Sequence, residues 1–178
     1  MEITAKPTAS KGNVKLRDRY QNAWERIDGA LEQGFYFEAI AVEESILSNR
    51  ITSFLYGIKS LTAADLEGRT ATRKKRFWSL DQLIKLWRKA KEEGLVLEDS
   101  VCLIDRANDW RCRRNRALHE LTKSFPGKPP EADLCVFVDD VRETAQLGKR
   151  LASDVSNWHK RQKRRDQKTH TLTPTAGI

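Results

Sequence analysis

Hydrophobic and polar residues alternate along most of this chain at steps of three and four, the period of a helix that buries one face. The pattern is cleanest in residues 37–63. Its stripe contains Phe37, Ile40, Glu44, Leu47, Ile51, Phe54, Ile58 and Leu61. Glu44 is the only residue of this stripe that is not apolar. The pattern therefore predicts a long core helix that carries one carboxylate on its apolar face.

The same period predicts four more helices, at residues 16–33, 79–93, 98–124 and 132–160. Gly34 and Gly94 follow two of them, as is common at helix C-termini. Ser79 has a side chain suited to cap the helix that it precedes. Residues 135–138 alone also fit a strand, but the helical period continues beyond them. We therefore predict an all-α fold, an up-and-down antiparallel bundle of about five helices.

The length of 178 residues suits one domain with a core of its own. Because the helical period spans residues 16–160, we assign the helical domain to this range. Residues 1–15 carry Pro, Gly, Ser and Lys without a period, which predicts a flexible N-terminal arm. Residues 161–178 are first basic and then polar, again without a period, and we predict a disordered tail there.

The net charge of +8 favours a polyanionic partner, with nucleic acid as the first candidate. The alternative is that the charge serves only solubility. Two clusters concentrate it, in residues 160–165 and in Arg73, Lys74, Lys75 and Arg76. Such clusters hold phosphates in a salt-sensitive way that is independent of sequence. We expect residues 73–76 to contact RNA, whereas the tail is as readily explained as a solvated charge run.

The chain has three cysteines, Cys102, Cys112 and Cys135, without the CxxC spacing of a metal site. They are typical of reduced thiols in a cytoplasmic protein. No apolar run is long enough for a membrane span, and the N-terminus lacks the apolar run of a signal peptide. We therefore expect a cytoplasmic protein that does not enter a membrane.

The most unusual stretch is residues 111–120, near the end of the predicted fourth helix. Apolar residues upstream set a seam at spacings of four and three, and Arg114 occupies a position of this seam where an apolar residue is due. Asn115 and His119 lie four residues apart, so their side chains meet on an adjoining face. A guanidinium on a buried seam is costly unless it is paired.

Glu44 and Arg114 are the two polar interruptions of otherwise apolar seams, and the simplest account is an ion pair between them across the bundle. Arg50 or an asparagine is an alternative partner for one of the two. The pair itself has two interpretations. It forms part of a functional site, or it is a core salt bridge that only fixes the register of two helices.

The sequence Arg114-Asn115-x-x-x-His119 resembles the Arg-(four to six)-His motif of HEPN domains, small α-helical proteins of prokaryotic toxin and defence systems. The resemblance implies a bundle of four to five helices that forms a homodimer, with two motifs at a shared cleft. It also implies RNA cleavage without a metal or another cofactor. On this basis Arg114 and His119 are the expected catalytic residues, and Asn115, Glu44 and Arg111 are expected to support them.

Cleavage of RNA by its own 2′-OH requires a base, an acid for the leaving oxygen, and cations for the phosphoryl charge. One chain offers too few titratable groups near His119 for both proton transfers, which agrees with a dimeric site; Glu43, Glu44 and Glu120 are the only nearby groups that could supplement it. Arg116 lies where it can hold a phosphate. No second metal ligand shares a face with His119 at ligand spacing. We therefore expect a metal-independent endoribonuclease, with an antitoxin or other neutralising protein as a further partner.

The alternative is a non-catalytic bundle that keeps the motif as an RNA-binding or protein-interaction site. A poorly placed His119, together with a purely structural Glu44–Arg114 pair, would favour this alternative. The sequence alone leaves both functions open.

Overall fold

The computed structural model describes residues 11–59, 78–97, 100–121 and 130–171. These residues form helices and connecting turns without a strand, which confirms the all-α fold. The helices are α1 (Lys11–Glu32), α2 (Tyr36–Gly57), α4 (Leu80–Glu92), α5 (Ser100–Leu121) and α6 (Pro130–Thr171).

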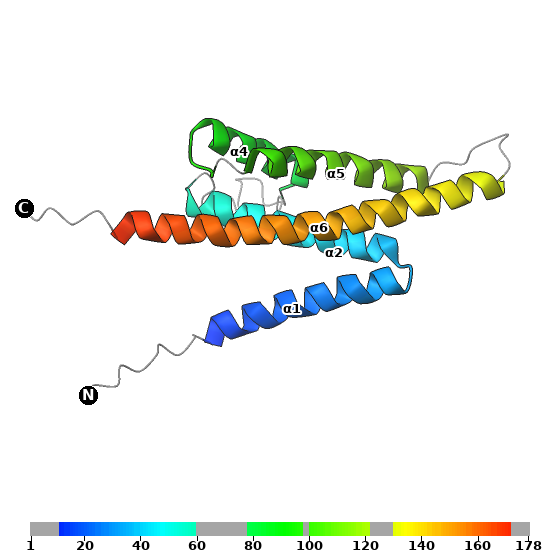
Figure 1. The fold of residues 1–178 in the computed structure, drawn as a ribbon, viewed down its shortest axis with the longest axis horizontal. Helices are drawn as coiled ribbons and strands as arrows, with labels where there is room; N and C mark the ends of the chain where they lie inside the picture. The colour runs from blue at the N-terminus through cyan, green and yellow to red at the C-terminus, as the bar shows by residue number, and fades with distance from the viewer. Residues whose placement is uncertain (1–10, 60–77, 98–99, 122–129, 172–178) are drawn as a thin grey trace, which may run out of the picture.

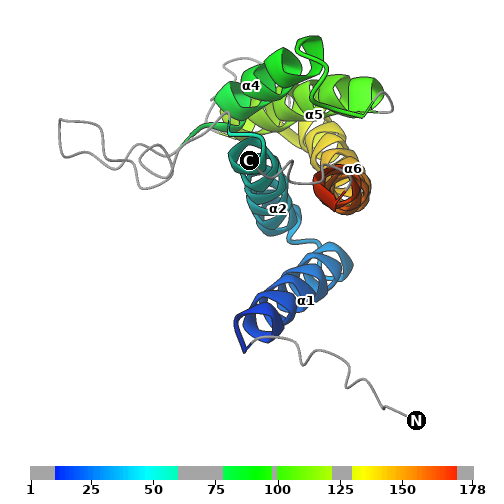
Figure 2. The same cartoon turned by 90° about the vertical axis from the view of Figure 1, so that its left-hand side faces the viewer.

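The helices are arranged in three layers (Figures 1 and 2). Viewed along the bundle in Figure 2, α2 and α6 lie in the middle, α4 and α5 lie above them, and α1 lies below. The middle layer is therefore covered on both sides, and it separates α1 from α5. α2 contacts α1, α4 and α6, so it carries much of the core.

Helices that follow each other through a short turn are antiparallel, as expected, but α2 and α6 run in the same direction. Phe37 lies against Phe137 and Phe54 lies against Trp158, so residue numbers rise together along both helices. α5 runs against α6, since the indole N–H of Trp110 donates a hydrogen bond to the carbonyl oxygen of Thr144 (2.9 Å), whereas residue 106 pairs with residue 154.

A group of three aromatic side chains joins α2, α4 and α6. The ring of Trp158 lies 4.7 Å from that of Trp87 and 5.0 Å from that of Phe54, between ring centroids. Both tryptophans are fully buried. Because a buried aromatic side chain removes a large apolar area from water, this contact is a principal source of the bundle's stability.

The predicted helix boundaries hold for α4 and differ elsewhere. Ser79 forms a capping box with Gln82, and Gly34 and Gly94 have the positive φ values of 78° and 71° that suit glycine after a helix. α1 begins at Lys11, inside the predicted N-terminal arm of residues 1–15, and α2 ends at Gly57 rather than near residue 63.

The prediction that the helix ends at Lys160 and a disordered tail begins at residue 161 was wrong as far as Thr171, where α6 ends. Gln162 explains the difference. Its side chain is buried, accepts a hydrogen bond from the N–H of Leu97 (3.1 Å) and donates one to the carbonyl oxygen of Leu95 (3.2 Å). A polar side chain thus continues the buried face of the helix, which an apolar period cannot reveal.

Among the described residues, none of the helices has the length and apolar content that a membrane span requires.

Gly148 of α6 is a point of close approach. A Cβ atom added there would lie 2.0 Å from the Oε2 atom of Glu43 and 2.6 Å from the Nε1 atom of Trp110. We expect Gly148→Ala to lower the free energy of unfolding by about 1–3 kcal/mol, the usual cost of overpacking a core, in a urea titration.

The matched control is Gly29→Ala in α1, where an added Cβ has no heavy atom within 4 Å. That change should raise stability by roughly 0.5–1 kcal/mol, because alanine favours the helix. Equal effects of the two substitutions would show that the space at Gly148 is not limiting.

Candidate functional site

The residues of the predicted site lie on the second half of α5. Arg111, Arg114, Asn115 and Leu118 follow each other at steps of three, one and three, so they share one face of the helix, and His119 lies at its edge. Asn115 is half-buried, whereas Leu118 and His119 are exposed. His119 is in the last turn of α5. The motif therefore passes from a packed region to the protein surface within five residues.

The predicted ion pair between Glu44 and Arg114 is confirmed. The Nη2 atom of Arg114 donates a short hydrogen bond to the Oε1 atom of Glu44 on α2. The Arg114 side chain is 16% exposed and that of Glu44 is 32% exposed. Arg50, the alternative partner, instead lies over the ring of Tyr20. The ion pair thus fixes the guanidinium of the motif against α2 while leaving its edge in contact with solvent.

Arg111 ties the same face of α5 to α4. Its Nη2 atom lies 3.4 Å from the Oδ1 atom of Asp81 and donates a hydrogen bond to the side-chain oxygen of Asn108 (3.1 Å). A hydrogen bond from Lys85, together with the charges of Lys85 and Arg111, holds the pKa of Asp81 below its ordinary value. Arg111 therefore helps to hold α5 against α4. Its predicted role beside the catalytic residues stays a prediction.

Both arginines keep unused hydrogen-bonding capacity. The Nε atoms of Arg111 and Arg114 are buried and have no acceptor among the described residues. Buried donors without partners are uncommon because they lose their hydrogen bonds to water. An anion or an ordered water beside these guanidinium groups would offset that cost, as expected of side chains that face a ligand.

The other predicted RNA-binding residues are placed in part. Arg116 is exposed on α5. Residues Arg73, Lys74, Lys75 and Arg76 lie outside the described residues. Among the described residues, the positive charge around the motif therefore comes mainly from side chains of α5.

The sequence interpretation placed the carboxylate of the apolar face at Glu44 and named Glu43 only as a titratable group near His119, but among the described residues Glu43 is the buried one. Glu43 of α2 is fully buried, and neither of its carboxyl oxygens has a hydrogen-bond partner among the described residues. Burial raises the pKa of Glu43 to about 8, and the charge of Lys149 has a smaller effect in the opposite direction. The carboxyl group is therefore mostly protonated at neutral pH, next to the backbone of Gly148.

A signal for Glu43 was present in the sequence. Residue 43 follows Ala39 by four positions and precedes Leu47 by four, and both of these residues are buried. The apolar period alone could not choose between the two adjacent glutamates, because positions 43 and 44 both continue the steps of three and four between Ile40 and Leu47. The small residue at position 148, which makes space for a carboxyl group, could be recognised only once α6 was placed against α2.

Large apolar side chains are exposed at the end of the bundle where the motif lies. Leu118 is 42% exposed beside His119. The first turns of α6, which lie at the same end as the last turns of α5 (Figure 1), expose Leu134, Val136 and Val138. Exposed apolar residues that gather in one region are typical of protein interfaces.

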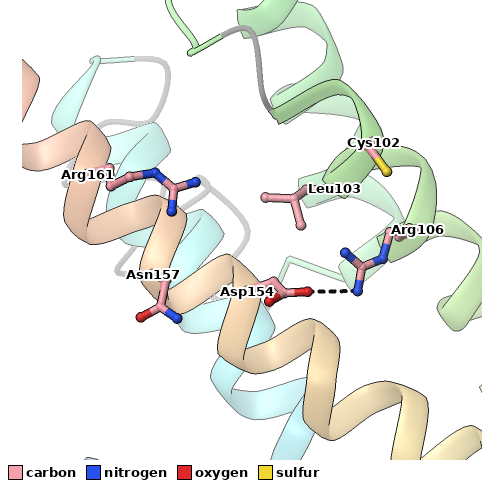
Figure 3. A pocket seen from close by; sticks show the side chains of 6 residues that line it. All are labelled: Cys102, Leu103, Arg106, Asp154, Asn157 and Arg161. Carbon is pink, nitrogen blue, oxygen red and sulfur yellow. Dashed lines mark hydrogen bonds and ion pairs between the residues drawn. The ribbon is translucent and has the colours of Figure 1, made fainter.

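A groove of about 330 Å³ lies farther along α5, against α6. In Figure 3 it is flanked by an ion pair between Arg106 and Asp154 (2.8 Å), with Cys102 and Arg161 at its edges. It contains none of the predicted site residues. The carboxylate of Asp154 neutralises one of its two arginines, so this groove has no strong preference for an anion.

In the described part of the chain, no three His, Cys, Asp or Glu side chains are grouped in a way that could hold a metal ion. Cys102, Cys112 and Cys135 are exposed and form no disulfide.

Comparisons with models of protein families, with curated proteins and with solved structures find no match to this chain.

The buried carboxyl of Glu43 predicts a distinct pH dependence of stability. Its pKa is near 4.5 in the unfolded chain and about 8 in the folded protein, so the folded protein keeps a proton that the unfolded chain has lost. The free energy of unfolding should therefore fall as the pH rises through this window, with a slope of up to about 1.4 kcal/mol per pH unit. Glu43→Gln should remove this component.

The measurement is urea denaturation of both proteins at several pH values between 5 and 8.5, with the difference between their stabilities followed as a function of pH. Contributions of groups that the two proteins share cancel in this difference. Parallel curves would contradict a raised pKa for Glu43.

Proposed function

We propose that this protein is a metal-independent endoribonuclease of the HEPN type, which cuts RNA by attack of the 2′-OH at a site formed by two subunits. The observation that carries the proposal is the state of Arg114. Its guanidinium is held by Glu44 on a neighbouring helix, its Nε donor has no acceptor among the described residues, and it lies about one and a half turns from an exposed histidine.

His119 is the proposed proton-transfer group and Arg114 the proposed cation for the phosphoryl oxygens. The exposure of His119 gives it access to a 2′-OH or to a leaving 5′-oxygen. Glu44 fixes the orientation of Arg114, which lowers the entropic cost of positioning that side chain in the transition state. The proposed role of Asn115, one turn before His119, is to hold the imidazole ring, and that of Arg116 is to hold a neighbouring phosphate.

A second copy of the chain is the proposed source of the other proton-transfer group. Base and acid are both needed, and the motif of one chain contains a single histidine. Leu118 gives this copy an apolar contact directly beside His119, and Leu134 and Val138 extend the apolar surface at the same end of the bundle. A two-fold interface there would bring two His119 side chains to a common cleft.

The resemblance of the motif also suggests the biological setting, a toxin or defence effector in the cytoplasm that is controlled by an antitoxin or another neutralising protein. The net charge of +8 agrees with an RNA substrate.

The second candidate function is a non-catalytic RNA-binding or protein-interaction module. It is favoured by the same ion pair, because a guanidinium that is engaged by Glu44 already has a structural role in joining α2 and α5. Its distinguishing property would be RNA affinity without turnover.

We expect the purified protein to cleave RNA in excess chelator and to leave a 2′,3′-cyclic phosphate or its hydrolysed form. His119→Ala should lower the cleavage rate by about 10²–10⁴, the usual contribution of a general acid or base, with little loss of RNA affinity. Arg114→Lys should also be inactive, because an ammonium group lacks the planar fork that contacts both Glu44 and a phosphate.

Two control variants each replace a histidine or an arginine that lies outside the motif. His159→Gln removes a histidine of α6, and Arg113→Ala removes the neighbouring arginine, which pairs with Glu143 (3.4 Å). Both should cleave at the wild-type rate. Cleavage of RNA with a 2′-O-methyl group at the cut site would contradict the mechanism, and RNA binding with no cleavage by the wild type would favour the second candidate.

The dimer is tested by placing a charge beside the motif. Leu118→Glu should convert the dimer to a monomer in sedimentation experiments at micromolar concentration and should abolish cleavage, because a buried unpaired carboxylate is incompatible with an apolar contact. The matched control is Leu95→Glu, which changes a leucine of similar exposure, 38% against 42%, at the other end of α5. A wild-type monomer that cleaves RNA would exclude the composite site.

A further inference from the structure

A groove of about 420 Å³ is lined by residues of α1, α2 and α6. Figure 2 shows that α1 covers the side of the middle layer opposite to α5. This volume is in the range of small-molecule sites. Its lining combines cationic, aromatic and hydroxyl side chains. The residues that matter here are Arg17, Tyr20, Trp24, Arg50, Ser156 and Lys160.

The charge of this groove is of one sign. Arg17 of α1, Arg50 of α2 and Lys160 of α6 line it, and no carboxylate of the described residues does. The groove in Figure 3 differs in this respect, since Asp154 pairs with Arg106 there. Three cations from three separate helices, without an acidic neighbour in the lining, attract an anion.

Arg50 is held in position by an aromatic contact rather than by a carboxylate. Its guanidinium carbon lies 3.8 Å from the centre of the Tyr20 ring, and the Tyr20 hydroxyl donates a hydrogen bond to the Oδ1 atom of Asn49 (2.6 Å). A cation over a ring is stabilised by the ring's quadrupole but keeps its full charge. The guanidinium is therefore both fixed and available for an anionic ligand.

Two polar atoms beside the groove lack partners. The Nε atom of Arg50 and the Oγ atom of Ser156 are buried and have no hydrogen-bond partner among the described residues. Ser156 as a whole is only 5% exposed, and it belongs to the lining. Buried polar groups without partners cost free energy in the folded protein, and a ligand that supplies acceptors offsets this cost.

The neighbouring histidine is consistent with this positive environment. Burial lowers the pKa of His159 to about 4, and the charge of Arg50, which lines the groove, contributes. The imidazole is therefore neutral at neutral pH.

The groove also has an aromatic wall. Arg50 covers the face of Tyr20, whereas Trp24 of α1 is half-buried and lines the groove. An indole is a good surface for stacking a nucleobase, and guanidinium and ammonium groups bind phosphate. We propose that this groove binds a nucleotide, with its phosphate at Arg50, Arg17 and Lys160 and its base against Trp24.

The site is separate from the motif. α1 and α5 cover opposite sides of the layer formed by α2 and α6 (Figure 2), and none of the lining residues belongs to α5. Nucleotide binding here does not depend on ribonuclease activity, and failure of either proposal leaves the other in place.

The test is isothermal titration calorimetry of the full chain with ADP, inorganic phosphate and adenosine as separate probes. ADP should bind at least about tenfold more tightly than either fragment, because only ADP uses both the cations and the aromatic wall. Lys160→Ala should weaken ADP binding about tenfold, the effect of losing one charge-assisted hydrogen bond. Trp24→Leu should reduce the advantage of ADP over phosphate.

The matched control is Lys163→Ala, which removes the same charge from α6 at an exposed position outside the groove lining. It should bind ADP like the wild type. Absence of ADP binding at about 1 mM, or equal affinities for ADP and phosphate, would overturn the proposal. An equal loss in Lys160→Ala and Lys163→Ala would also overturn it, because binding would then follow net charge rather than the groove.

Discussion

The buried carboxyl of Glu43 constrains the arrangement of α2, α5 and α6. It occupies space that the missing side chain of Gly148 leaves free, and the indole of Trp110, held by the carbonyl of Thr144, borders the same space. Successive residues of a helix point about 100° apart. Because Glu43 faces α6, Glu44 is turned toward α5, where it meets Arg114. The position of the motif arginine is thus determined by a core contact that involves no residue of the motif.

Much of this bundle could be predicted from the sequence because helix formation is local. The period of three and four predicted each of the helices that the structure describes and, for Glu44 and Arg114, a pair of polar interruptions that do meet. What could not be predicted depends on contacts between helices. The parallel course of α2 and α6, the burial of Glu43 rather than Glu44, and the position of Arg50 over Tyr20 all follow from packing.

Arg111 and Arg114, on the side of α5, are held in a different way from Arg50, on the side of α1. On the side of α5, arginines are paired with acidic side chains of other helices, as Arg111 is with Asp81 and Arg114 with Glu44. On the side of α1, Arg50 is held by an aromatic ring and its charge is not neutralised by a neighbouring carboxylate. Paired arginines fix the geometry of a surface, whereas an unpaired one gives it a local positive potential.

The hydrogen bonds of Gln162 show that the folded unit extends beyond Lys160 along α6. Both groups that it satisfies, the N–H of Leu97 and the carbonyl oxygen of Leu95, belong to the connection that leads from α4 into α5. A truncated protein that stops at Lys160, where the apolar period fades and the basic run begins, would leave these two backbone groups without their partner. The start of the helix that carries the motif would then fray. The first residues of the basic segment after Lys160 therefore stabilise the start of α5. A domain boundary chosen from charge composition alone would remove them.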